Sequence, residues 1–192
     1  MLVMRHEPVL DQVLDLAQSL IQLRGYNAMS YRDLANEIGV KTSSIHYYFQ
    51  AKEDLGLALL KRYRLAFKSA LASIDAESSD PKIKIERFIA LFIDTVRTGK
   101  ICLGGMFATD CTTLPRSMQD EVKRFYTENE AWLTEVLKQG REMNKLDFSG
   151  SPKIKAETIF SILEGVMIAA RLFNDEKRLI SAGEWIQSSL DK

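Results

Sequence analysis

The chain has 192 residues, of which 46% are hydrophobic and 27% charged, and its 26 basic residues balance 26 acidic ones. This composition is typical of a globular protein and excludes a disordered or collagen-like chain. The apolar runs are far shorter than the roughly 18 residues that a membrane span needs, and the N-terminus lacks the pattern of a secretion signal. Because Cys102 and Cys111 are the only cysteines, no disulfide framework is expected, which favours a reducing, cytoplasmic setting.

Apolar residues recur at spacings of three and four along most of the chain, which predicts helices and no strands. The first helix is expected to begin near Pro8 and to end at Gly25. A second, short helix is expected over residues 31–38, because Ser30 and Asp33 can form a capping box at its start.

Two further elements complete the N-terminal part. Gly39 tolerates left-handed backbone and ends the second helix, and Thr42 is expected to cap a third helix over residues 43–49. A fourth and longer helix is expected from Lys52 to about Ile74.

The rest of the chain predicts a second bundle of longer helices. Asp80 followed by Pro81 favours a helix start, and the segment 101–111 is expected to form a short helix after Gly104 and Gly105. Long helices are then expected over about residues 116–144, 153–173 and 176–190. The predicted fold class is therefore all-α, with about nine helices.

The segment VKTSSIHYYF, residues 40–49, combines three hydroxyl residues, a histidine and three aromatic rings. On a helix, Ile45 and Phe49 share one face and are expected to pack inward. Four polar or aromatic side chains then point outward: Ser43, Ser44, His46 and Tyr47. Two short helices joined at residues 39–41 form a helix-turn-helix, whose second helix enters the major groove of DNA, where hydroxyl groups and rings can meet base edges and thymine methyl groups.

The flanking residues suit contact with DNA phosphates. The expected contacts come from the start of the second helix, the turn, and the third and fourth helices: Ser30, Tyr31, Arg32, Lys41, Thr42, Tyr48 and Lys52. Solvated charges that pair with Glu37 or Asp54 are the alternative for Arg32 and Lys52. Simple surface aromatics are the alternative for residues 46–48.

The stretch SYRDLANEIGVKTSSIHYYFQAKEDL, residues 30–55, resembles the signature of the TetR family of bacterial transcriptional regulators. The matching residues are Arg32, Asp33, Leu34, Ala35, Gly39, Val40, Phe49, Lys52, Glu53 and Leu55. The sequence departs from the family pattern at Thr42 and Ser43, at His46, where tyrosine is usual, and at residues 50–51, which leaves the fourth helix weakly capped. The resemblance covers about residues 8–68 and otherwise rests on helix number and length.

This resemblance implies a homodimeric repressor that binds double-stranded operator DNA and is released by an unidentified small molecule. The residues themselves indicate no catalytic activity, cofactor, metal or membrane partner. The resemblance further implies a helix-turn-helix DNA-binding domain at residues 1–52, a connecting helix at 52–74, which would transmit ligand binding, and a ligand-binding and dimerisation domain at 75–192. The last two helices would form the dimer interface through these residues: Ile159, Ile162, Leu163, Val166, Met167, Ala170, Trp185 and Ile186.

Aromatic and sulfur-containing residues of the C-terminal part allow two interpretations, a ligand cavity or a packed core: Phe88, Phe92, Cys102, Met106, Phe107, Phe125, Trp132 and Phe160. The segment CLGGMFA also resembles a segment of family subgroups whose thiols sense oxidants or electrophiles, whereas free cysteines such as Cys102 and Cys111 are commonly small buried hydrophobes. A helical small-molecule-binding or protein-interaction module without DNA binding is the alternative function. No catalytic or metal-ligand spacing indicates an enzyme.

Overall fold

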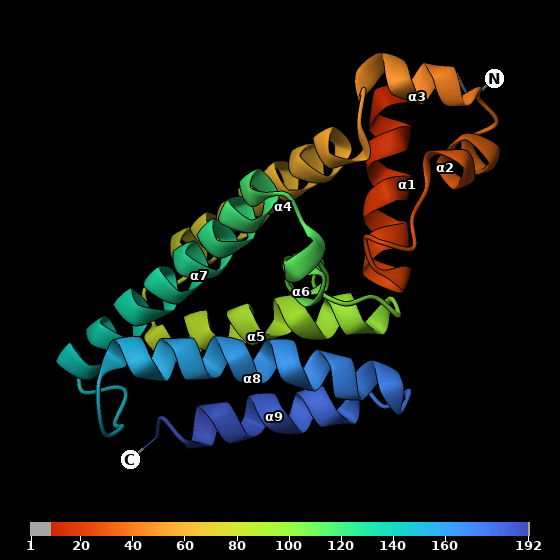
Figure 1. Cartoon of the computed structure of the whole chain (residues 1–192). Helices are drawn as coiled ribbons and strands as arrows, with labels where there is room; N and C mark the ends of the chain where they lie inside the picture. Colours follow the sequence, from red (N-terminus) through yellow and green to blue (C-terminus); the bar gives the residue numbers. More distant parts are fainter. Residues whose placement is uncertain (1–8, 192) are drawn as a thin grey trace, which may run out of the picture.

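The computed structural model describes residues 9–191, and every regular element within them is helical, which confirms the predicted all-α class (Figure 1). Pro8, expected in the first turn, lies outside the described residues. The elements are α1 (Val9–Arg24), α2 (Tyr31–Ile38), α3 (Thr42–Tyr48), α4 (Lys52–Glu77), α5 (Pro81–Arg97), α6 (Leu103–Thr109), a 3-10 turn (Cys111–Thr113), α7 (Arg116–Glu142), α8 (Pro152–Leu172) and α9 (Lys177–Ser188).

The boundaries of α2 follow from local signals in the sequence. Ser30 Oγ accepts a hydrogen bond from Asp33 N at 3.2 Å, and Ser30 N donates to Asp33 Oδ2 at 3.2 Å, so the expected capping box forms. Gly39 ends the helix with φ of 78°, a left-handed conformation that glycine adopts without a steric penalty. The chain can therefore turn sharply into α3.

The starts of α3 and α4 are capped less well. The prediction that Thr42 caps α3 was wrong, because the helix begins at Thr42 and its N-cap residue is Lys41. The ammonium group of Lys41 can only donate, so it offers no side-chain acceptor, and the first turn closes through the backbone between Ser44 N and Lys41 O at 2.9 Å. At α4, Ala51 likewise has no acceptor, but Ala51 N donates to Asp54 Oδ2 at 2.9 Å. The fourth helix thus keeps one half of a capping box.

α6 begins earlier than expected, at Leu103 rather than after Gly104 and Gly105. Both glycines lie inside the helix because neighbouring side chains leave no room for a Cβ atom. A Cβ on Gly104 would come within 2.5 Å of the Phe125 ring, and one on Gly105 would overlap the carboxylate of Glu164. The two glycines therefore allow α6 to lie close to α7 and α8.

The helices form a small end and a larger base (Figure 1). α1, α2 and α3 make the small end, and α4 runs from it along α7 to the base, where α5, α8 and α9 lie side by side. α6 lies between the two parts and packs against α1, α4 and α7. Within the described range, no helix has both the length and the hydrophobicity to cross a lipid bilayer.

Candidate nucleic-acid interface and ligand cavity

α3 lies at the tip of the molecule, at the end opposite α8 and α9 (Figure 1). Its inner face is apolar, because Ile45 and Phe49 are buried. Ser43 and His46 are exposed, and Tyr47 is 83% exposed. The helix is thus anchored along one edge and presents hydroxyl and aromatic groups along the other, the placement that the sequence predicted for a reading helix; contact with DNA stays a prediction.

Neighbouring rings hold the exposed side chains of α3 in place. Tyr47 and Tyr48 pack edge to face with ring centroids 5.1 Å apart, and His46 packs in the same manner on Tyr31 at 4.9 Å. His46 Nδ1 lies 3.2 Å from the carbonyl of Gln50, which can only accept, so Nδ1 donates and Nε2 is left for an outside partner. These contacts reduce the conformational entropy that the side chains lose on binding a partner.

Two residues expected to contact phosphates are used inside the protein. Tyr31 is buried, and its Oη donates to the carbonyl of Ala51 at 2.6 Å. Burial also raises the pKa of Tyr31 well above its ordinary value. The hydroxyl of Ser30 donates to Asp33 Oδ2 at 2.7 Å. Both residues therefore stabilise the helix-turn-helix. For buried Tyr31 this corrects the predicted contact with phosphates, whereas half-buried Ser30 remains partly accessible.

Of three basic residues in this region, Lys52 interacts with other groups of the protein, whereas Arg32 and Lys41 are exposed. Lys52 Nζ lies 4.5 Å from the centre of the Tyr26 ring and donates to the carbonyl of Asn27 at 3.3 Å, and burial lowers the pKa of Lys52. Arg32 and Lys41 are exposed, and neither forms an ion pair with any residue of the described range 9–191. Arg32 and Lys41 are thus better placed than Lys52 to pair with phosphates.

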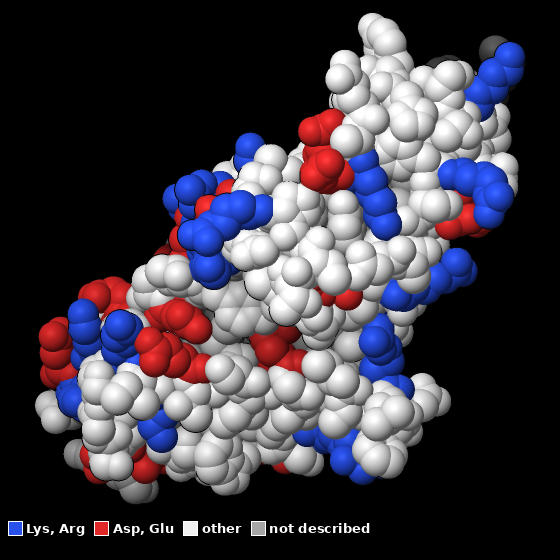
Figure 2. All heavy atoms as spheres, viewed as in Figure 1, with Lys and Arg blue, Asp and Glu red and all other residues white. Residues whose placement is uncertain are grey.

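The remaining expected contacts are at least partly accessible: Thr42 and Ser44 are half-buried and Tyr48 is exposed. Figure 2 shows a tip that is largely uncharged on the face in view, with Lys and Arg side chains along its outer edge. Acidic side chains are more frequent in this view towards the other end of the molecule, beside α7. Acidic side chains also occur at the tip, where residues 30–55 hold four acidic residues (Asp33, Glu37, Glu53 and Asp54) and three basic ones (Arg32, Lys41 and Lys52), so the net charge of the tip does not by itself favour a polyanion.

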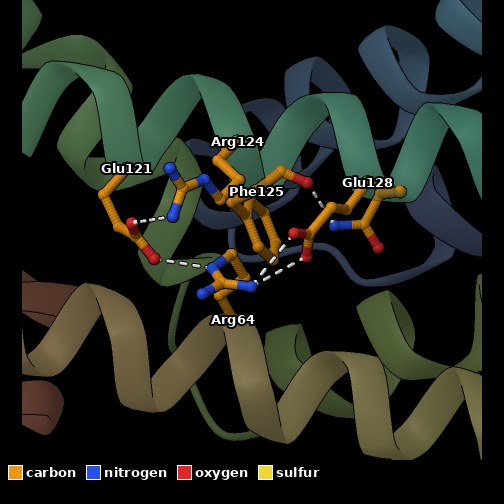
Figure 3. A network of polar contacts seen from close by, with 6 residues as sticks. Arg64, Glu121, Arg124, Phe125 and Glu128 are labelled. Atoms are coloured by element: carbon orange, nitrogen blue, oxygen red, sulfur yellow. Dashed lines mark hydrogen bonds and ion pairs between the residues drawn. The ribbon is translucent and has the colours of Figure 1, made fainter.

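An ion-pair network joins α4 to α7 (Figure 3). Arg64 Nε lies 2.6 Å from Glu121 Oε1, and its Nη1 lies 3.0 Å from Glu128 Oε1. Arg124 makes a longer contact, 3.4 Å, with the other oxygen of Glu121. The side chains of Arg64 and Glu121 are only 15% and 5% exposed, so the pair is shielded from water. The network fixes the helix that leads to the tip against the C-terminal helices.

Hydrogen bonds join the two parts in addition to α4. Gln22 Nε2 at the end of α1 donates to the carbonyl of Ile101 at 3.0 Å, and Ile101 N donates to the carbonyl of Gln22 at 3.3 Å. Tyr26 N donates to Asp110 Oδ2 at 3.1 Å, and Arg171 Nη1 donates to the Gln22 carbonyl at 3.2 Å. Segments on both sides of α6 are therefore hydrogen-bonded directly to the helix-turn-helix part.

Two cavities border these connections. One, of about 330 Å³, lies between α4 and α7 beside Arg64 and Trp132. The other, of about 360 Å³, lies between α6, α7 and α8, and is lined by Met106, Tyr126 and Glu164 among others. Both have the size of small-molecule sites.

Most of the residues expected to line a ligand cavity form the packed core instead. Five phenylalanines are fully or almost fully buried and border neither cavity: Phe88, Phe92, Phe107, Phe125 and Phe160. Rings of this set pack on one another, for example Phe88 and Phe92 with centroids 5.3 Å apart. Of the predicted set, Met106 and Trp132 lie on a cavity wall.

Cys102 is buried behind the second cavity. Tyr63 Oη donates to Cys102 Sγ at 3.6 Å, and burial raises the pKa of the thiol well above its ordinary value. A protonated, shielded thiol reacts slowly, which favours the interpretation of Cys102 as a small buried hydrophobe. Cys111 is half-buried and unpaired.

The stripe predicted for a dimer interface faces the protomer's own core. Five of its members are buried and cannot form a contact surface: Ile159, Leu163, Met167, Ala170 and Ile186. Ile162 and Val166 are half-buried, and Trp185 is exposed as expected. The error has a physical reason, because α8 packs between α7 and α9 and its predicted stripe is the one that meets them.

A different surface of α8 and α9 is apolar and open. Five of the eleven large apolar side chains that are exposed within residues 9–191 belong to this region: Ile154, Ile168, Leu172, Phe173 and Trp185. Along α8, Ser161, Gly165, Ile168 and Leu172 follow each other at spacings of four, three and four, so they share one face.

An exposed, anchored second helix in a helix-turn-helix, carried on a separate helical bundle, defines a DNA-binding regulator of transcription. The sequence profile of the family described as "Bacterial regulatory proteins, tetR family" matches residues 13–59. The chain is 36% identical to a TetR transcriptional regulator from Legionella pneumophila of known structure, covering 98% of this chain and 100% of that one with a TM-score of 0.89. This chain belongs to the TetR family of transcriptional regulators.

Two other relatives agree with this assignment. A TetR-family regulator from Agrobacterium tumefaciens is 26% identical, with a TM-score of 0.93 over 96% of this chain and 98% of that one. The HTH-type transcriptional repressor NemR of Escherichia coli is 24% identical over 168 residues, which cover 84% of this chain and 83% of NemR. These relatives are named as transcriptional regulators and not as enzymes.

Proposed function

We propose that the protein is a repressor that binds operator DNA as a homodimer and is released by a small molecule. The observation that carries this proposal is the exposed edge of α3, where Ser43, His46 and Tyr47 face outward while Ile45 and Phe49 anchor the helix. In this account residues 9–52 read DNA, α4 connects, and residues 75–191 bind the ligand and the partner subunit. A regulator of this kind acts with the chromosome, in the cytoplasm.

Release from DNA follows from linkage. A ligand that binds better to a conformation with wrongly spaced reading helices lowers operator affinity, and the operator lowers ligand affinity by the same factor. Couplings of this kind are about 1–3 kcal/mol, or roughly 5–150-fold. Both the ion pairs of Arg64 and the hydrogen bonds of Gln22 are suited to carry the change.

Fluorescence anisotropy with DNA from upstream of the protein's own gene tests the proposal. The purified protein is expected to bind one such fragment more tightly than a scrambled duplex of equal length, with affinity that falls as salt rises. Equal, weak binding to every duplex at low salt would support the alternative, a helical module without DNA recognition.

Replacing Tyr47 with alanine is expected to reduce affinity for the operator by about 1–3 kcal/mol, because a ring at a base edge is lost. Tyr47 is 83% exposed, so the melting temperature is expected to stay the same. Ile83→Ala, at an exposed apolar position on α5, is the control and should not affect DNA binding. Equal affinities of wild type and Tyr47→Ala would remove this residue from the reading surface.

Homodimerisation is proposed through the open face of α8 and α9. Replacing Leu172, which is 76% exposed, with glutamate places a charge in that face and is expected to yield a monomer of 21.8 kDa in place of a dimer of twice that mass. Light scattering after gel filtration measures the mass. Leu65→Glu, at a 56% exposed position on α4, is the matched control and should remain dimeric; a monomeric control or a dimeric Leu172→Glu contradicts the assigned surface.

A further inference from the structure

Glu164 is a carboxylate in an otherwise uncharged part of α8. From Thr158 to Ala170 it is the only charged residue, and it is 8% exposed. Neither of its oxygens accepts a hydrogen bond from an N–H or O–H group among the described residues, and the donor beside it is the weak Cys102 thiol. A weak thiol donor compensates little of the cost of burying a carboxylate, so Glu164 can still bind a stronger, charged donor.

The surroundings of Glu164 supply no cation. Its neighbours are the phenol of Tyr63 from α4, the thiol of Cys102 at the start of α6 and the phenol of Tyr126 from α7. Arg171 lines the same cavity, but its Nη1 donates to the carbonyls of Gln22 and Leu23, in the helix-turn-helix part. The carboxylate therefore lacks a positive partner of its own.

The cavity beside Glu164 has room for one. Its volume is about 360 Å³, and Gly105 and Tyr126 lie on its wall together with Met106 and Ile168. Oε2 of Glu164 lies directly against Gly105, where a Cβ atom would overlap it. A glycine at this point keeps the carboxylate next to the cavity, and the apolar and aromatic wall suits an uncharged body.

We propose that this cavity binds an organic cation, a protonated amine on an apolar body, whose ammonium group pairs with Glu164 while the body packs against Tyr126 and Met106. The ring of Tyr126 adds a surface that attracts cations. The claim that this cation releases the protein from DNA rests on the function proposed above. The claim that the cavity binds the cation does not.

The position of the site connects it to the DNA-binding end. Tyr63, next to Glu164, is part of α4, and Ile101 and Arg171, on the cavity wall, hydrogen-bond to Gln22 of α1. An ammonium group bound to Glu164 would therefore contact residues linked to both α4 and the hydrogen bonds of Gln22, which connect the two parts.

Calorimetric titration tests the proposal with two matched series of probes: primary amines from butylamine to octylamine with benzylamine, and the corresponding alcohols. Wild-type protein at pH 7.5 is expected to bind at least one amine roughly 10-fold or more tightly than its alcohol, the contribution of a charge-assisted hydrogen bond. In Glu164→Gln this preference should disappear. Glu157→Gln, on the same helix but outside this cavity, should retain it.

A second measurement is the release of a proton when an amine binds. Burial raises the pKa of Glu164 to about 7, against the opposing effect of the Cys102 thiol, whereas Tyr63, Cys102 and Tyr126 stay protonated. Amine binding at pH 6 should therefore release a proton in the wild type but not in Glu164→Gln. The proposal is overturned if no amine outcompetes its alcohol, or if the preference survives in Glu164→Gln. DNA binding measured on the same samples tests the proposed function separately. If the wild-type protein without ligand fails to bind operator DNA, the proposed repressor function is contradicted, but the proposed ligand class is not.

Discussion

Replacing Arg64 with methionine is expected to lower the free energy of unfolding by about 3 kcal/mol, because Glu121 is left as a buried carboxylate without its close partner. The remaining contact of Glu121, with Arg124 at 3.4 Å, is too long to replace the 2.6 Å pair. Urea denaturation at one fixed protein concentration measures the change, since the stability of a dimer depends on concentration.

Two further variants separate a buried ion pair from a general effect on α4. Arg62 forms a pair with Asp15 whose side chains are 34% and 61% exposed, so Arg62→Met should cost less than about 1 kcal/mol. Arg64→Met combined with Glu121→Gln should recover most of the lost stability, because no unpaired charge is then buried. Equal losses in the Arg62 and Arg64 variants would show that the network of Figure 3 contributes no more than a surface pair.

Glu164 is expected to make the stability of the protein depend on pH. Its pKa is about 7 in the folded protein, mainly because of burial, and 4.5 in an unfolded chain. Burial penalises only the ionised carboxylate, so the folded protein is more stable below pH 4.5, where Glu164 is protonated in both states, than at higher pH. That stabilisation is lost as pH rises towards 7, because the unfolded chain gives up its proton first. The loss amounts to about 3 kcal/mol at about 1.4 kcal/mol per pKa unit.

Comparison of Glu164→Gln with wild type isolates this effect. The free energy of unfolding of the variant minus that of the wild type should grow by about 3 kcal/mol between pH 4.5 and 7, and should level off above pH 8. Other carboxylates titrate in both proteins and cancel in the difference. A flat difference for Glu164→Gln would show that its carboxyl is not shielded in solution.

The helices were predictable because their signals are local. The Ser30–Asp33 capping box, left-handed Gly39 and the Asp80–Pro81 start all act within a few residues, and each is present in the structure. The anchored edge of α3 was predictable for the same reason, since the spacing of Ile45 and Phe49 fixes which side faces inward.

The missed features depend on contacts between residues far apart in the sequence. α8 has apolar residues on more than one face, and the sequence does not say whether the stripe with Leu163 or the one with Leu172 meets the protomer's own core. The neighbours of Glu164 come from three other helices. The one local signal of that site is Glu164 itself, a single charge among uncharged residues. The same pattern is equally consistent with an exposed surface position.

Tyr31 and Lys52 illustrate a further limit. Both occur where the family motif is expected to meet DNA, yet Tyr31 bonds to Ala51 and Lys52 to Asn27. A polar side chain can form hydrogen bonds either within the protein or with an outside partner, and the fold determines which of the two occurs.

The central claim is that two copies of α3 read one face of a duplex. Chemical footprinting of the bound operator, with a reagent that modifies guanine N7 in the major groove, tests it most directly. The account predicts two protected major-groove segments, related by two-fold symmetry, with centres roughly 34 Å or a multiple of that distance apart. A single protected segment, or protection confined to the minor groove, would contradict it.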